Sequence, residues 1–169
     1  MKTAGVILAI VAALALQTTL GRFITRATVA VDLVLVVVVY VALTSGPVTG
    51  LLAGTAAGLA QDALSSGVIG IGGLAKTLVG FLTGIIGTQF IVAQPFSRFV
   101  VFMAASVLHA IVFIGVYVVL DLRQIEAPYA AVAGQALGNA VIGVAAFQLV
   151  ELLPGVVERR RSQRARIRR

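Results

Sequence analysis

The chain has 169 residues, of which 60% are hydrophobic and 11% charged, and its mean hydropathy is +1.09. Soluble domains carry about 25% charged residues, so this composition excludes an ordinary soluble domain. With one histidine and no cysteine, the chain also lacks disulfides, thiolate metal sites and cysteine nucleophiles. Seven of the 13 basic residues lie in ERRRSQRARIRR, residues 158–169, and a basic tail beside apolar segments suits an anionic lipid surface rather than a nucleic acid.

Six apolar stretches follow one another along the chain, and a helix needs about 20 such residues to cross a bilayer. They cover residues 4–20, 29–44, 46–64, 68–92, 99–120 and 128–153. The second stretch is short and rich in valine, but a lone strand in lipid would leave its backbone unpaired, so a helix is expected. The sequence therefore predicts an all-α integral membrane protein, with a six-helix transmembrane domain over residues 1–153 and a basic cytoplasmic tail over residues 154–169.

The basic residues of the short loops favour a cytoplasmic location for both termini. In a six-span chain Lys2, Arg98 and the arginine tail share one side of the membrane. Arg22, Arg26 and Arg123 fall on the other side, where the first two oppose the prediction mildly. The tail decides this orientation.

Glycines recur at every fourth position in the third and fourth stretches, so they share one face of each helix. They are Gly46, Gly50, Gly54 and Gly58 in the third stretch, and Gly72, Gly80 and Gly84 in the fourth. Small residues on one face let two helices approach closely in lipid. Because only a short turn at residues 65–67 joins the two stretches, we expect a close-packed hairpin.

Two charged residues continue these glycine faces. Asp62 is the next member of the first series, and Lys76 lies between Gly72 and Gly80 in the second. A charge that faces lipid costs at least ~2.5–3.5 kcal/mol, so both side chains should face the interior of the bundle. Helical side chains tilt toward the N-terminus, which directs Lys76 toward Asp62. Two interpretations stay open: a salt bridge or cap that holds the hairpin, or a functional cavity that both residues line.

Four other polar residues of the apolar stretches are candidates for a specific role. Asp32 opens the second helix, where a carboxylate caps the backbone and meets the positive end of the helix dipole. His109 has no second ligand at metal-binding spacing, so a hydrogen-bonded packing role is expected. Gln135 and Asn139 share a face of the sixth helix, which favours interhelical hydrogen bonds. The sequence predicts no metal and no cofactor.

A family pattern runs from Asp32 to Lys76, about a third of the chain. An aspartate opens VDLVLVVVVYVAL (31–43), a hydrophobic run that contains a tyrosine, and SGPVTGLLAGTAAGLAQD (45–62) follows with a Gly-Pro turn and a glycine-rich helix. Asp62, Ser65 and Gly70 form a D-x-x-S-x-x-x-x-G pattern, and GLAKTLVGFLTG (73–84) completes the run. This order resembles MreD, the rod shape-determining membrane protein family of bacteria, in which a proline usually stands at the place of Val31.

The resemblance implies a non-enzymatic scaffold of the bacterial inner membrane. MreD proteins partner MreC in the elongation machinery that builds the lateral cell wall, together with the actin-like MreB, the glycosyltransferase RodA and a class B penicillin-binding protein. Their fold is similar to the S-components of energy-coupling-factor vitamin transporters, which are six-helix bundles. Asp32, Asp62, Ser65, Gly70 and Lys76 are then the residues of the family motif or of the polar interior.

Two alternatives come from other functional classes. The chain could be an actual S-component that binds a vitamin, although its outer loops are short and offer few groups to close over a substrate. It could also be a rhomboid-like serine protease, which needs a serine within reach of a histidine base. Leu64 stands where the protease pattern GxSG requires glycine, and Ser66 is expected far from His109, so this alternative is disfavoured.

Overall fold

The structure is a computed structural model that describes residues 3–23, 31–65, 67–90, 92–122 and 129–167. These residues form six helices and no strand: α1 (Thr3–Phe23), α2 (Leu33–Ser45), α3 (Pro47–Leu64), α4 (Ile71–Gln89), α5 (Pro95–Val119) and α6 (Tyr129–Ile167). The predicted all-helical architecture is therefore confirmed for this part of the chain. Lys2, Arg26, Ser66 and Arg123, used in the sequence-based arguments, lie outside the described residues.

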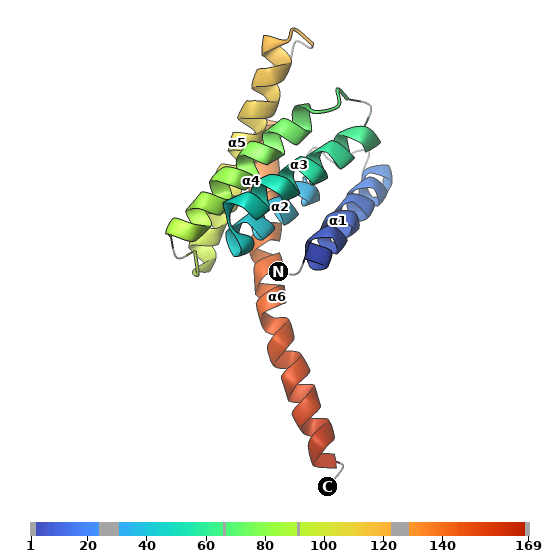
Figure 1. Ribbon diagram of the computed structural model, residues 1–169, viewed down its shortest axis with the longest axis vertical. Coiled ribbons are helices and arrows are strands. Elements are labelled where there is room, and N and C mark those ends of the chain that lie inside the picture. Colours follow the sequence, from blue (N-terminus) through green and yellow to red (C-terminus); the bar gives the residue numbers. More distant parts are fainter. Residues whose placement is uncertain (1–2, 24–30, 66, 91, 123–128, 168–169) are drawn as a thin grey trace.

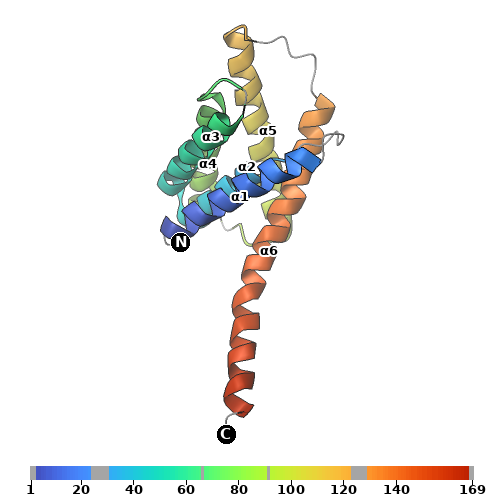
Figure 2. The same ribbon diagram turned by 90° about the vertical axis from the view of Figure 1, so that its right-hand side faces the viewer.

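Among the described residues, three helices are long and apolar enough to cross a membrane: α4, α5 and residues Tyr129–Leu152 of α6. The apolar part of α1 (Thr3–Thr19) and the whole of α2 are shorter. Helix α6 continues beyond the bundle to Ile167, so the basic segment that follows Leu152 is helical and projects from one end of the molecule (Figures 1 and 2).

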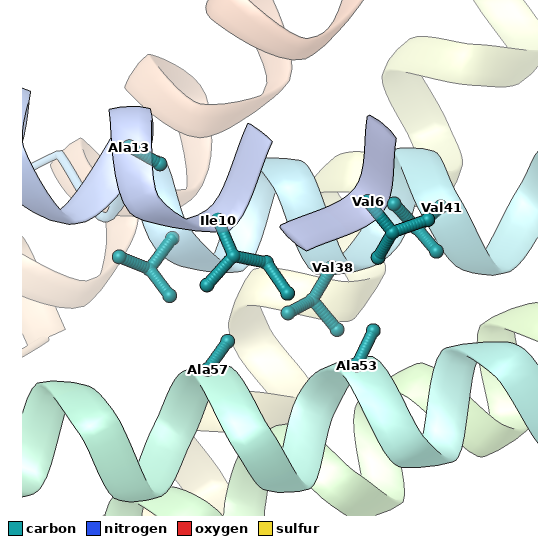
Figure 3. Close-up of a cluster of buried hydrophobic side chains, with 8 residues drawn as sticks. Val6, Ile10, Ala13, Val38, Val41, Ala53 and Ala57 are labelled. Atoms are coloured by element: carbon teal, nitrogen blue, oxygen red, sulfur yellow. The ribbon is translucent and has the colours of Figure 1, made fainter. Parts of the chain in front are cut away.

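Helix α2 occupies the centre of the fold and packs against each of the other helices. Its apolar residues are buried on every side of the helix, which explains why its sequence shows no polar face: Val34, Leu35, Val36, Val38, Val39, Val41 and Ala42. On one side, Val38 and Val41 meet Val6 and Ile10 of α1 and Ala53 of α3 (Figure 3). The valine-rich run is therefore a core helix rather than a lipid-facing one.

Helices α3 and α4 pack backbone to backbone along their glycine faces. A Cβ atom added at Gly50 would overlap the carbonyl oxygen of Gly80, and one added at Gly54 would overlap the carbonyl oxygen of Lys76. A Cβ at Gly58 would lie 2.6 Å from the Cα of Gly73. Only glycine permits this approach, which explains the four-residue spacing of both series.

The remaining glycines of the two series have different roles. Gly84 packs against the backbone of Pro47, while the space beside Gly72 is filled by the carboxylate of Asp62. Gly46 has a φ of +86° and lies at the turn between α2 and α3, where a left-handed backbone favours glycine. Helix α4 begins at Ile71 rather than at the expected residue 68, because Gly70, with a φ of +106°, turns the chain just before it.

Candidate functional site

A buried charged cluster joins three helices at the centre of the bundle. Lys76 of α4 is 2% exposed, and its Nζ lies 2.7 Å from Oδ2 of Asp32, which precedes α2. The same Nζ lies 3.2 Å from Nε2 of His109 on α5. Because an ammonium group can only donate, Nε2 accepts this hydrogen bond and the imidazole carries its proton on Nδ1. The sequence directed Lys76 toward Asp62, but the structure pairs it with Asp32.

The other carboxylate oxygen of Asp32 caps α2. Its Oδ1 accepts a hydrogen bond of 2.9 Å from the backbone N–H of Leu35, as the position at the start of the helix predicts. Asp32 therefore combines the expected local cap with an ion pair to a distant helix. Sequence reasoning identified only the first role, because the second depends on how α2 and α4 pack.

A chain of hydrogen bonds extends the cluster to α6. The backbone N–H of Asp32 donates to Oδ1 of Asn139 (2.9 Å), and Nδ2 of Asn139 donates to Oγ of Ser106 on α5 (3.0 Å). Ser106 in turn donates to the carbonyl of Phe102 at 2.9 Å. Asn139 thus makes interhelical hydrogen bonds of the predicted kind, while no such bond is found for Gln135 within the described part of the chain. These bonds fix α2, α5 and α6 against one another.

Asp62 caps α4 from the last turn of α3. Its Oδ2 accepts hydrogen bonds from the backbone N–H groups of Gly70 (2.8 Å) and Gly73 (3.1 Å), which would otherwise have no partner at the start of the helix. Ser65 ends α3 and is exposed; its N–H donates to the carbonyl of Asp62, and its Oγ donates to the carbonyl of Gln61. The spacing of Asp62, Ser65 and Gly70 is therefore the geometry of the α3–α4 turn.

A cavity of about 280 Å³ opens beside these groups. It lies at the end of the bundle where α3 and α5 finish and where α2, α4 and α6 start, the upper end in Figure 1. Its polar lining includes Gln17, Asp32, Gln61, Asp62, Lys76, His109, Tyr117 and Gln135. Asp62 and Lys76 thus line one cavity; the expected salt bridge between them does not form, while the expected cap by Asp62 does.

A second polar cluster lies near the opposite end of α5. Arg98 is 6% exposed; its Nη1 donates to Oε2 of Glu151 at 2.9 Å, and its Nη2 donates to the other carboxylate oxygen. The guanidinium carbon lies 4.4 Å from the centre of the Phe147 ring. Sequence reasoning used Arg98 only as a loop charge. The signal it missed is the four-residue spacing of Phe147 and Glu151, which puts both on one face of α6.

The arrangement of His109 and Ser106 is not that of a catalytic base and its nucleophile. Nε2 of His109 already accepts a hydrogen bond from Lys76, and the nearby Ser106 donates to a backbone carbonyl. Among the residues that the structure describes, no group of three or more His, Cys, Asp or Glu side chains is placed to hold a metal ion. What the arrangement does is lock four helices together around a polar cavity.

A family model described as rod shape-determining protein MreD matches residues 1–154. The chain belongs to the MreD family. The match confirms the resemblance drawn from residues 32–76 and extends it over almost all of the bundle. Comparison with curated proteins gives no match, and comparison with solved structures gives none either. MreD proteins are rod shape-determining membrane proteins, a structural family rather than a known family of enzymes.

Proposed function

We propose that this MreD-family chain is a non-enzymatic scaffold that binds MreC and helps to couple MreB filaments to peptidoglycan synthesis. The observation that carries the proposal is the family match over residues 1–154, because MreD proteins belong to the rod shape-determining system. RodA and a class B penicillin-binding protein act in the same assembly. The buried network of Asp32, Lys76 and Asn139 supports a structural role, since it joins helices rather than presenting reactive groups.

In this proposal all six helices cross the bacterial inner membrane and both termini lie in the cytoplasm, in a bundle similar to that of an S-component. The alternating directions of the helices support it: α3 and α5 end where α2, α4 and α6 begin (Figure 1). The arginine-rich end of α6 would then meet anionic lipid at the cytoplasmic surface. The cavity would open toward the periplasm.

Single cysteines test this orientation cleanly, because the chain has none of its own. Ser65 and Gln94 are exposed and lie in turns at opposite ends of the bundle. A membrane-impermeant maleimide added to intact spheroplasts should label Ser65→Cys and leave Gln94→Cys unlabelled until the membrane is opened. The reverse pattern would contradict the orientation, and labelling of both in intact cells would contradict the spans between them.

Association with MreC is tested by co-purification from native-lipid extracts. Tagged chain should retain MreC, and an unrelated six-span protein with the same tag should not. If MreC is absent from extracts in which the chain is folded and abundant, the proposed partnership is wrong.

The docking face can be found by crosslinking. A photoreactive residue placed at exposed Leu8, Val48, Ile111 or Val141 samples α1, α3, α5 and α6 in turn. Fully buried Val79 is the matched negative position. MreC adducts confined to one or two of these helices would define the contact, whereas equal adducts at every exposed position would indicate random collision.

The polar cavity favours one second candidate, a substrate-binding S-component. Its volume of about 280 Å³ and its mixture of charged and aromatic walls suit a small molecule. A thermal-shift screen with vitamins separates the two functions. One strong and specific shift, abolished by a substitution in the cavity, would favour the transporter subunit over the scaffold.

A further inference from the structure

The cavity is bounded by two chemically different walls. The last turn of α3 contributes the polar groups of Gln61 and Asp62, and the first turns of α4 contribute Gly72 and Lys76. Helix α5 faces them with Phe113 and Tyr117, one turn apart, whose ring centres lie 4.9 Å from each other. At ~30 Å³ for each water, the cavity has room for about nine water molecules or for one small organic group.

The positive charge in the cavity is already neutralised. Lys76 pairs with Asp32 and donates to His109, so its ammonium is directed at two protein acceptors. An anionic ligand would have to compete with Asp32 for Lys76 and would approach the carboxylate of Asp62. Of the two aspartates on the walls, Asp32 pairs with Lys76, whereas Asp62 forms no ion pair with any residue that the structure describes.

Among the residues that the structure describes, two acceptor oxygens on the polar wall receive no hydrogen bond. Both hydrogen bonds to Asp62 reach Oδ2, and in the described part of the chain none reaches Oδ1, although the residue is 9% exposed. Oε1 of the neighbouring Gln61 is buried and likewise has no hydrogen-bond partner there. For the buried Oε1 of Gln61 a missing donor costs about 1–3 kcal/mol, so a ligand with N–H groups would recover this loss.

We propose that the cavity binds a small organic ammonium ion carrying N–H donors. The carboxylate of Asp62 supplies the counter-charge, Gln61 accepts a second hydrogen bond after a small rotation of its amide, and the faces of Phe113 and Tyr117 attract the cation. Two sources have this chemistry: the ethanolamine headgroup of a membrane lipid, entering from the surface at this end of the bundle, or a free amine. The site goes beyond the scaffold function and does not require MreC.

The test uses the full chain in detergent, read by native mass spectrometry and by the thermal midpoint. Short-chain phosphatidylethanolamine should bind and raise Tm, whereas phosphatidylglycerol with the same acyl chains should not. Phosphatidylcholine should bind more weakly, since its trimethylammonium has no N–H donor. Ethanolamine and spermidine form a second, lipid-free series. Binding of the lipid alone identifies a headgroup site, and binding of the free amines identifies a soluble ligand; both support the proposal.

Substitutions of cavity residues test whether the ammonium ligand binds in the cavity. Asp62→Asn keeps an oxygen for the cap of α4 but removes the charge, so it should weaken binding at least about tenfold, the change expected for one charge-assisted hydrogen bond. Gln61→Leu and Phe113→Leu leave that cap untouched and should also weaken binding, which keeps the test valid if Asp62→Asn is unstable. Glu151→Gln removes a carboxylate outside the cavity and should bind as the parent does.

Three results would overturn the proposal. One is equal binding of phosphatidylethanolamine and phosphatidylglycerol. Another is equal binding of phosphatidylethanolamine and phosphatidylcholine, which would remove the argument from the unpaired acceptors. The third is the absence of binding in both series, or binding that survives all three cavity substitutions.

Discussion

Asp32 and Lys76 form an ion pair that is almost completely buried, with 4% and 2% of each residue exposed. The pair joins the start of the central helix α2 to α4, and His109 adds a bond from α5. In a low-dielectric interior such a pair adds little net stability, but removing one partner leaves an uncompensated charge. The pair is therefore a sensitive point of the fold.

We expect Lys76→Met to destabilise the protein by about 3–5 kcal/mol, because it leaves the buried carboxylate of Asp32 without a counter-charge. For a chain of this size, that corresponds to a fall in Tm of roughly 10 °C. Adding Asp32→Asn should recover much of the loss, since the amide keeps the cap on Leu35 without a charge. Leu74→Met, on the exposed side of α4, is the control. A Lys76→Met protein with unchanged Tm would show that the pair does not form.

The glycine contact between α3 and α4 predicts a sharp contrast among small substitutions. Gly50→Ala and Gly80→Ala each push a methyl group into the backbone of the facing helix, at a cost of about 1–3 kcal/mol. Gly115→Ala is the matched control, because a Cβ there meets nothing within 4 Å. The control should be neutral or gain up to about 1 kcal/mol from better helix propensity. The thermal midpoints of the three variants, measured in one detergent, test this prediction. Equal changes in Tm for all three would contradict the close backbone contact between α3 and α4.

The α3–α4 turn predicts an order of severity. Gly70→Ala forces a side chain into a left-handed backbone, which costs about 1–3 kcal/mol. Asp62→Ala removes the cap of α4 at a cost of about 0.5–2 kcal/mol, and Asp62→Asn should lose less because it retains an acceptor. Complementation of a deletion strain and Tm can be measured together. If Asp62→Ala complements the deletion strain fully and its Tm is unchanged, the hydrogen bonds of this carboxylate contribute to neither folding nor function.

The Arg98 cluster predicts that a conservative change is not tolerated. Arg98→Lys keeps the charge but loses the forked pair of hydrogen bonds to Glu151 and the flat contact with Phe147. We expect a measurable fall in Tm, because the Arg98 side chain is buried and its ammonium replacement cannot make both contacts. Glu151→Gln should be milder, because the Glu151 side chain is 55% exposed. A more severe effect of Glu151→Gln than of Arg98→Lys, measured as Tm, would reverse this interpretation.

Periodicity was enough to predict the α3–α4 hairpin. The four-residue spacing of Gly50, Gly54 and Gly58 predicts one face of α3 that carries only small residues. The free-energy cost of a charge in lipid predicts that the side chains of Asp62 and Lys76 face the interior of the bundle. Both side chains are buried in the structure. These predictions succeeded because they depend on one helix, or on two helices joined by a short turn.

What periodicity could not predict is which groups meet across the bundle. Lys76 had two aspartates within the same region of sequence, and only the position of α2 selects Asp32. The cavity depends in the same way on residues from all parts of the chain, such as Gln17 and Tyr117.

The central position of α2 has a consequence for how the protein is made. Two polar partners at the start of this helix are synthesised after it: Lys76 arrives with α4, and Asn139, 107 residues beyond Asp32, arrives with α6. The buried start of α2 therefore reaches its final set of contacts only after the last helix of the bundle has been synthesised and packed.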